Sequence, residues 1–147
     1  MSLKALPLPK RAQTKGADVS FFDDNYVLAE SQNLEFKEAA GQLPDDVWET
    51  YSAFGNTEGG EIVLGVREDK VTHEFSLVGV EDPRGIVDAF WETVRNPKKV
   101  SRDITLPDSV RVISRGDMEF VSIEVPRAER DDKPVMVYDR RSKSFVA

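Results

Sequence analysis

The sequence predicts an α+β fold in which two main helices pack on a mixed β-sheet, and three patterns carry this prediction. Amphipathic helical stripes occur around residues 44–55 and again around residues 82–94. Between them lies the unbroken apolar run 62–66, which is typical of a strand covered on both faces. Short apolar runs separated by turn residues follow the second stripe. The order strand, helix, strands, helix, strands therefore favours a mixed sheet with two helices packed on it.

The domain is expected to begin near residue 21. Bases, prolines and small residues without hydrophobic periodicity fill residues 1–20, which we interpret as a flexible N-terminal arm or a cloning remnant. Residues 21–147 have the usual length of one domain. Within them, the segment Leu-Glu-Phe-Lys at 34–37 alternates apolar with charged residues, as in a half-buried strand. Leu34 and Phe36 are therefore expected to face the core.

The first helix is predicted from its N-terminal residues and its apolar stripe. Pro44 suits a first helical position, and Asp45 and Asp46 follow in the first turn, where the helix dipole favours anions. One helical face then carries Val47, Trp48, Tyr51 and Phe54, and the helix should end near Gly55. The next residues, 56–60, are predicted to form one tight turn leading into the central strand 62–66.

The second helix has a clear start and stop. Asp82 is the predicted N-cap, Pro83 follows at the first position, and Pro97 lies beyond the end. Beyond it, the strands 110–114 and 119–125 flank a short glycine-containing hairpin loop, and a final strand is predicted at 134–138. The residues on the apolar face of each helix or strand are expected to share one core. They are Phe36, Val47, Phe54, Ile62, Leu64, Phe90 and Ile123.

Composition excludes several classes of site. The chain has no cysteine, which rules out disulfides, thiolate metal sites and a cysteine nucleophile, and it has a single histidine, His73, which rules out a two-histidine metal site. No apolar run approaches the roughly 20 residues needed to span a bilayer. We therefore expect a cytoplasmic protein without a membrane partner.

The charge is segregated along the chain. A net charge of −7 opposes binding to phosphates unless the bases are gathered. Between Asp23 and Glu49 there are eight acids and only one base, Lys37, whereas the stretch from Arg95 to Arg115 has six bases and two acids. The densest positive cluster, and so the predicted site of phosphate contacts, is Lys98, Lys99 and Arg102.

Two local motifs have a recognisable pattern. The first is Glu-Ser-Gln-Asn-Leu-Glu-Phe-Lys-Glu at 30–38, and the second is Ala-Phe-Gly-Asn-Thr-Glu-Gly-Gly at 53–60, followed by Ile-Val-Leu-Gly-Val at 62–66. Together they resemble the Schlafen AlbA-like domain, a family of DNA-binding type, over about residues 26–147. Lys-Pro-Val at 133–135 and Ser-Phe-Val at 144–146 resemble its closing strands more loosely.

This resemblance implies a nucleic-acid-binding module, with DNA or RNA as partner and no cofactor. In the bacterial proteins of this type, the module belongs to a transcriptional regulator and precedes further C-terminal domains, so the chain is expected to be a fragment of a longer protein. Strand edges and the family's habit of pairing domains make a homodimer a candidate assembly. The turn residues Asn56, Thr57, Gly59 and Gly60 have two interpretations, a helix terminator only, or a terminator whose amides also cradle a phosphate beside Lys37.

Two alternatives to a binding module remain open. The first is a divalent-metal-dependent nuclease or endoribonuclease, because the resemblance implies catalytic metal ligands at Glu30, Glu35 and Asp69, or Glu68 in place of Asp69. Three carboxylates would suit Mg²⁺ or Mn²⁺, and Lys37, on the same strand face as Glu35, would steady a phosphate. A cross-strand salt bridge explains that Glu-x-Lys pair equally well. The second alternative is a protein-interaction module without nucleic acid.

Overall fold

The computed structural model describes residues 33–147, which form eight strands, two α-helices and one short 3-10 helix. In chain order these elements are β1 Leu34–Lys37, α1 Val47–Gly55, β2 Gly60–Leu64, β3 Val66–Glu68, β4 Phe75–Leu77, α2 Pro83–Val94, β5 Val110–Arg115, β6 Met118–Val125, η1 Arg130–Asp132, β7 Val137–Asp139 and β8 Ser144–Val146.

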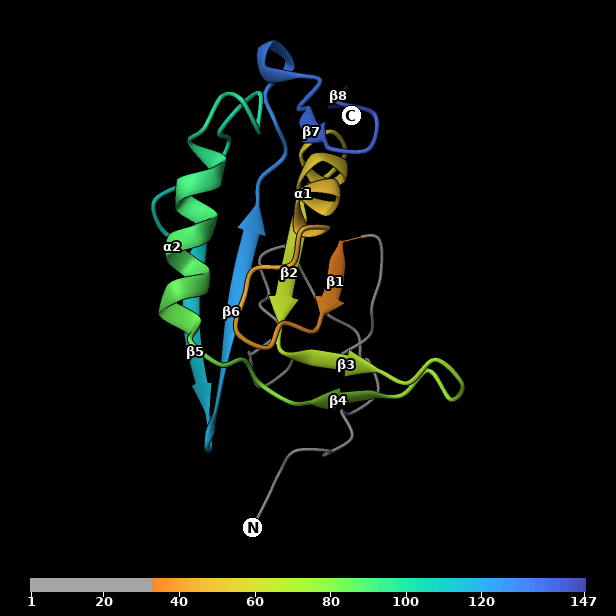
Figure 1. Ribbon diagram of the computed structural model, residues 1–147, viewed down its shortest axis with the longest axis vertical. Helices are drawn as coiled ribbons and strands as arrows, with labels where there is room; N and C mark the ends of the chain where they lie inside the picture. Colours follow the sequence, from red (N-terminus) through yellow and green to blue (C-terminus); the bar gives the residue numbers. More distant parts are fainter. Residues whose placement is uncertain (1–32) are drawn as a thin grey trace.

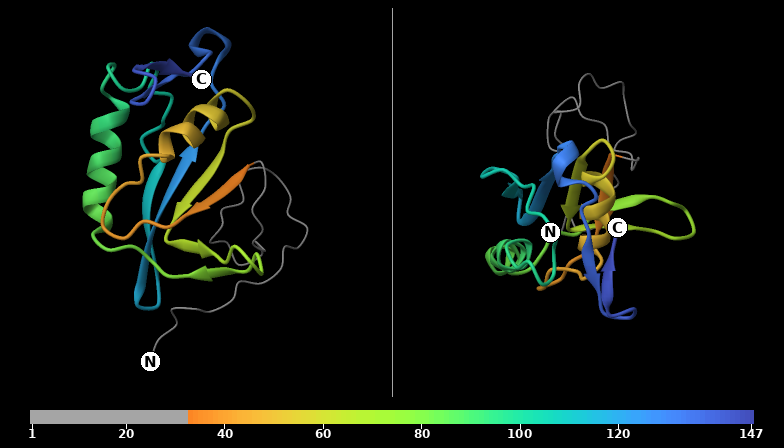
Figure 2. Two further views of the ribbon diagram at one scale, coloured as in Figure 1. Left: turned by 45° about the vertical axis from the view of Figure 1, so that its right-hand side comes forward. Right: turned by 90° about the horizontal axis from the view of Figure 1, so that it is seen from above.

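One mixed sheet with the strand order β1-β2-β6-β5 forms the centre of the fold (Figure 1). β1 runs parallel to β2, while β6 is antiparallel to both β2 and β5. The two other sheets are the hairpins β3–β4 and β7–β8 (Figure 2). This is the predicted α+β arrangement of a mixed sheet with two helices.

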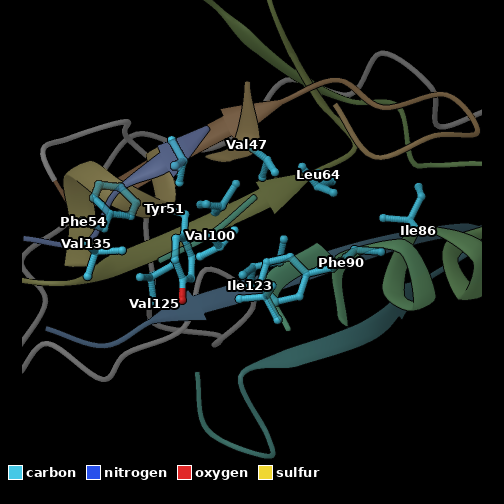
Figure 3. Packing of buried hydrophobic residues seen from close by; sticks show 14 of the residues in the cluster. Val47, Tyr51, Phe54, Leu64, Ile86, Phe90, Val100, Ile123, Val125 and Val135 are labelled. Carbon is cyan, nitrogen blue, oxygen red and sulfur yellow. The ribbon is translucent and has the colours of Figure 1, made fainter. Parts of the chain in front are cut away.

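The main hydrophobic core lies between the central sheet and the two helices (Figure 3). The stripes of α1 and α2 meet Ile62, Leu64 and Ile123 from the sheet, as predicted. Aromatic rings connect the two helices, because Trp48 of α1 stacks on Phe90 of α2 at a centroid distance of 5.0 Å. Val100 and Val135, from the loops that follow α2 and β6, close the same core.

The predicted position of Phe36 in this core is wrong. Phe36 packs in a second buried cluster with Leu34, Val63, Val66 and Phe120. β1 pairs with β2 so that Glu35 lies opposite Ile62 and Lys37 opposite Leu64, and paired residues point to the same side of a sheet. The charged residues of β1 therefore share the helix-covered face, and its apolar residues cover the other face.

Several boundaries differ from the predicted ones, and three of these differences change the description of the fold. The apolar run 62–66 is interrupted at Gly65, whose φ of +112° ends β2 and starts the unpredicted hairpin β3–β4. Residues 44–46 form a turn rather than helix, with the Val47 amide donating to the Pro44 carbonyl at 3.2 Å. The C-terminal strand β7 begins three residues later than predicted and pairs with β8.

Asp82 caps α2 as predicted, since its carboxylate accepts a hydrogen bond from the Gly85 amide at 3.1 Å. Neither helix within residues 33–147 has the length and apolar character needed to cross a membrane.

Candidate functional site

An open groove of about 740 Å³ lies at the C-terminal end of β1. Its lining comes from the end of β1, the turn that leads into α1 and the β3–β4 hairpin. The lining residues are Glu35, Phe36, Lys37, Glu38, Pro44, Asp46, Glu68 and Lys70.

Lys37 holds two carboxylates together on the wall of this groove. Its Nζ lies 2.9 Å from Glu35 Oε2 and 3.2 Å from Asp46 Oδ2, and its side chain is only 10% exposed. Thr50 of α1 donates a further hydrogen bond to Glu35 Oε2 at 3.1 Å. Burial by itself lowers the pKa of Lys37, but hydrogen bonds and charge attraction from Glu35 and Asp46 outweigh it and raise that pKa above its ordinary value. The ammonium is therefore fully charged at neutral pH, and its charge is balanced within the protein.

The acids of the β3–β4 hairpin point in different directions. Asp69 Oδ1 accepts the amides of Val71 at 2.8 Å and Thr72 at 3.0 Å, and these backbone hydrogen bonds lower the pKa of its exposed carboxyl group. Glu68 lines the groove, and its Oε2 lies 3.3 Å from Nδ1 of exposed His73. Glu68, rather than Asp69, thus shares the groove with Glu35.

The donor set for a metal is incomplete in the part of the chain that the structure describes. Glu30, one of the three predicted ligands, lies outside the described residues. Among residues 33–147, no three Asp, Glu or His side chains are grouped so as to hold a metal ion. The described side chains alone do not supply a set of three ligands, and metal binding by Glu30, Glu35 and Asp69 stays a prediction.

The turn between α1 and β2 lies where it was predicted, except that Gly60 is already the first residue of β2. The Asn56 amide donates to the Ser52 carbonyl, and the amides of Thr57 and Gly59 both donate to the Phe54 carbonyl, at 3.0, 3.1 and 2.8 Å. Gly59 adopts a φ of +81°. These three amides thus close the helix end and are not directed at solvent.

This turn also holds the chain that follows β6. The Asn56 side chain accepts the Val135 amide at 2.7 Å and donates to the Val135 carbonyl at 2.9 Å. Lys37 is not beside the turn, contrary to the suggested phosphate notch. In the β1–β2 register Lys37 lies opposite Leu64, whereas the turn precedes Gly60 at the other end of β2, roughly 13 Å away at the usual rise of a strand.

The loop after α2 presents its bases on the surface. Lys98, Lys99 and Arg102 are all exposed, and the Arg102 guanidinium lies 3.8 Å from Asp132. The backbone beneath them is anchored at several points. Val100 bridges to Val137, the Lys99 carbonyl accepts the Tyr138 amide at 2.8 Å, and the Tyr51 hydroxyl donates to the Arg102 carbonyl at 2.9 Å. The predicted positive cluster is thus displayed by a fixed loop.

Folding brings further bases to the same end of the molecule. In Figures 1 and 2, the loop after α2, the η1 region and the β7–β8 hairpin gather at the end opposite β3–β4. We define the basic end as residues 95–102, 127–133 and 140–143, which hold half of the chain's 20 bases and three of its 27 acids. These bases are Arg95, Lys98, Lys99, Arg102, Arg127, Arg130, Lys133, Arg140, Arg141 and Lys143.

Only the first of these three segments was predicted from the sequence. The stretch from Arg127 to Lys143 contains six bases and four acids, so its mixed charge gave little local signal. Three of those bases, Arg127, Arg130 and Lys133, line a second groove of about 580 Å³.

Comparison with known proteins identifies the family. The family model described as Schlafen, AlbA_2 matches residues 30–146, most of the chain. The chain belongs to the Schlafen AlbA_2 family. The match begins at Glu30 and ends at Val146, so both the groove and the basic end of this AlbA_2 domain lie within it.

A solved structure resembles the AlbA_2 domain in sequence and in fold. It is the N-terminal domain of a Nitrosomonas europaea protein named as related to the ATP-dependent DNA helicase RecG. The two chains are 25% identical with a TM-score of 0.60, and the match covers 77% of this chain and 73% of the other. No curated protein matches the chain.

Proposed function

We propose that this AlbA_2 domain binds nucleic acid and that its basic end contacts the phosphates. The observation that carries the proposal is the gathering of ten bases from three separate segments at one end of an acidic chain. Phosphate affinity comes from clustered Lys and Arg that displace counterions, so the local cluster matters more than the net charge of −7. The family, and a neighbour named after a DNA helicase, support nucleic-acid association.

The groove beside β1 is a poorer phosphate site than the basic end. Four acids line it, Glu35, Glu38, Asp46 and Glu68, against two bases, and one of these bases, Lys37, is already paired with two carboxylates. A polyanion is repelled from such a surface. We therefore assign phosphate contact to Lys98, Lys99 and Arg102 before Lys37.

The turn residues Asn56, Thr57, Gly59 and Gly60 have a supporting role in this proposal. The amides of Asn56, Thr57 and Gly59 close the end of α1, and the Asn56 side chain holds Val135, which lies two residues after the second segment of the basic end. The turn shapes the interface without contacting the phosphate. We further propose that the whole domain is a DNA-binding module of a transcriptional-regulator-like protein.

The test is the salt dependence of binding to a labelled DNA duplex. Replacing Lys98 and Lys99 together by Ala should weaken binding to all sequences alike and reduce the slope of log K against log salt by roughly 2, about one for each phosphate that no longer meets a lysine. The matched control is the double variant Arg67→Ala/Arg84→Ala, which removes the same charge from exposed positions at the opposite end. An unchanged slope in the Lys98/Lys99 variant, or equal losses in both variants, would contradict the proposal.

The same experiment separates the two alternative functions. A nuclease would degrade the labelled DNA or an RNA of the same sequence only when Mg²⁺ or Mn²⁺ is added, and Glu35→Gln would abolish that cleavage. Normal binding by the Lys98/Lys99 variant together with loss in Lys37→Ala would move the phosphate site to the groove. A protein-interaction module would neither bind nucleic acid nor cleave it.

A further inference from the structure

The β7–β8 hairpin displays two aromatic rings on its surface. Tyr138 and Phe145 lie directly opposite each other in the hairpin register, with ring centroids 5.9 Å apart and planes at 75°. Tyr138 is 41% exposed and Phe145 is 37% exposed, although large aromatic side chains are the ones that gain most from burial. Val137, the residue before Tyr138, points the other way and is buried.

Segments that carry basic residues lie on two sides of this aromatic pair. The turn that joins its two strands, residues 140–143, contains three bases, Arg140, Arg141 and Lys143. On the other side, the Tyr138 amide is hydrogen-bonded to the carbonyl of Lys99, which places the loop after α2 beside β7. The rings therefore lie between two of the three segments of the basic end.

The acids near the hairpin are largely engaged within the protein. The Asp139 carboxylate accepts the Ser142 amide at 3.2 Å and the Arg141 amide at 3.4 Å. Hydrogen bonding from the Ser142 side chain, together with these amides, lowers the pKa of Asp139. Asp45 Oδ2 lies 3.4 Å from Nη2 of Arg140, and both side chains are well exposed. An exposed ion pair of this kind is weak, so Arg140 can exchange Asp45 for a phosphate.

We propose that the β7–β8 hairpin is a stacking platform for unpaired bases, so that the domain prefers single-stranded to double-stranded nucleic acid. The inference rests on the proposed function and adds the class of ligand. Single strands are held by basic side chains that follow the backbone and by aromatic rings on which the nucleobases stack. In a duplex the faces of the nucleobases are already stacked on one another, and a ring on the protein surface cannot reach them. Exposed Tyr138 and Phe145 thus favour the single strand, whereas Lys98 and Lys99 contact the phosphates of single strands and duplexes alike.

The experiment compares a labelled oligothymidine of about 12 nucleotides with a duplex of the same length, a size within the range of single-strand sites. Tyr138→Ile and Phe145→Ile keep a large apolar side chain suited to a strand and remove the ring. Each should weaken single-strand binding by about 5- to 100-fold and leave duplex binding unchanged. The matched controls Tyr138→Phe and Phe145→Tyr keep the ring and should retain single-strand binding.

A second measurement uses the unaltered protein, so it does not depend on whether a variant disturbs the hairpin. A single strand that contains 5-iododeoxyuridine should form a photo-crosslink to Tyr138 or Phe145 in the unaltered protein. Crosslinks found only elsewhere would overturn the proposal, as would normal single-strand binding by both Ile variants.

Different results would refute the proposed function and the proposed stacking platform. If the Ile variants bind normally while the Lys98/Lys99 variant loses both ligands, only the stacking platform is wrong. If the unaltered protein binds neither ligand, both proposals fail. If the Ile variants instead dissociate a dimer in analytical ultracentrifugation, the rings are covered by a second copy of the chain and the stacking proposal is wrong.

Discussion

Tyr51 connects the hydrophobic core to the loop that carries Lys98, Lys99 and Arg102. The side chain is fully buried, and its hydroxyl donates to the Arg102 carbonyl and accepts the Ile104 amide, both at 2.9 Å. Burial raises the pKa of this phenol far above its ordinary value. The hydroxyl therefore stays protonated and holds the loop throughout the physiological pH range.

The first prediction removes this hydroxyl. Tyr51→Phe should lower the free energy of unfolding at pH 7 by about 1–3 kcal/mol, because the Arg102 carbonyl and the Ile104 amide lose a buried partner. In the unaltered protein, tyrosine ionises near pH 10 only after unfolding, so stability should fall as pH rises above about 10. Urea unfolding across this range should show a shallower fall in the variant. Parallel pH profiles for the two proteins would refute this role of Tyr51.

Lys37 acts on stability in the same alkaline range. Since its pKa is raised in the folded state, the stability that it contributes is present below its ordinary pKa and is lost as pH rises through the raised one. The comparison between Tyr51→Phe and the unaltered protein isolates the tyrosine, because Lys37 is present in both.

At the scale of elements, the α1–β2 turn joins three parts of the chain that are distant in sequence. Its amides end α1, its Asn56 side chain binds Val135, and Gly59 packs against the backbone after β6. A Cβ on Gly59 would lie 2.8 Å from the Val125 carbonyl oxygen and 3.0 Å from the Arg127 nitrogen. Neither neighbour is a flexible side chain, so the turn requires glycine at this position.

The second prediction compares two glycines. Gly59→Ala should cost about 1–3 kcal/mol, because the φ of +81° disfavours any side chain and the new methyl group meets backbone atoms. Gly41→Ala is the matched control, since its nearest neighbour would be Glu81 Oε1 at 4.0 Å, and it should change stability by less than about 0.5 kcal/mol. Thermal unfolding of both variants measures the difference. Equal melting temperatures would show that the turn tolerates a side chain.

The elements were predictable where their signals are local. The stripes of α1 and α2, the Asp82 cap and the β5–β6 hairpin depend on residues close together in the chain, and all four agree with the structure. The β3–β4 hairpin was missed because Gly65 breaks an apolar run that has the pattern of one continuous strand. The alternation in β1 was recognised, but a period of two does not say which face is the core, and Phe36 was assigned to the wrong one.

At the scale of the whole molecule, Phe90 connects the two helices to the sheet. Its fully buried ring stacks on Trp48 and makes edge contacts with Tyr51 and Trp91. The third prediction is that Phe90→Ala lowers the free energy of unfolding by about 3–5 kcal/mol. Leu106→Ala, at a loop residue that is 56% exposed, is the control and should cost less than about 0.5 kcal/mol. A loss below about 1 kcal/mol for Phe90→Ala in denaturant titration would mean that this cluster does not support the fold.

The candidate site was predictable only in part, because most of it depends on contacts between distant segments of the chain. Lys98, Lys99 and Arg102 form a cluster within five residues and were found from the sequence. Their association with residues 127–133 and 140–143 depends on long-range contacts such as Val100 with Val137 and Arg102 with Asp132. No periodicity or motif encodes such a contact, so most of the basic end became visible only in the folded chain.

Charge is distributed unevenly between the basic end and the other described residues, and this gives the domain an electric dipole. The basic end holds ten bases and three acids, while the other described residues hold six bases and 20 acids. In the field of a polyanion, a torque turns such a molecule before any contact forms, so that most encounters begin with the positive pole leading. The acidic residues of the remainder repel approaches in the wrong orientation. The proposed capture of nucleic acid should therefore be faster and more uniform in orientation at low ionic strength than at high ionic strength, where salt shortens the range of the field.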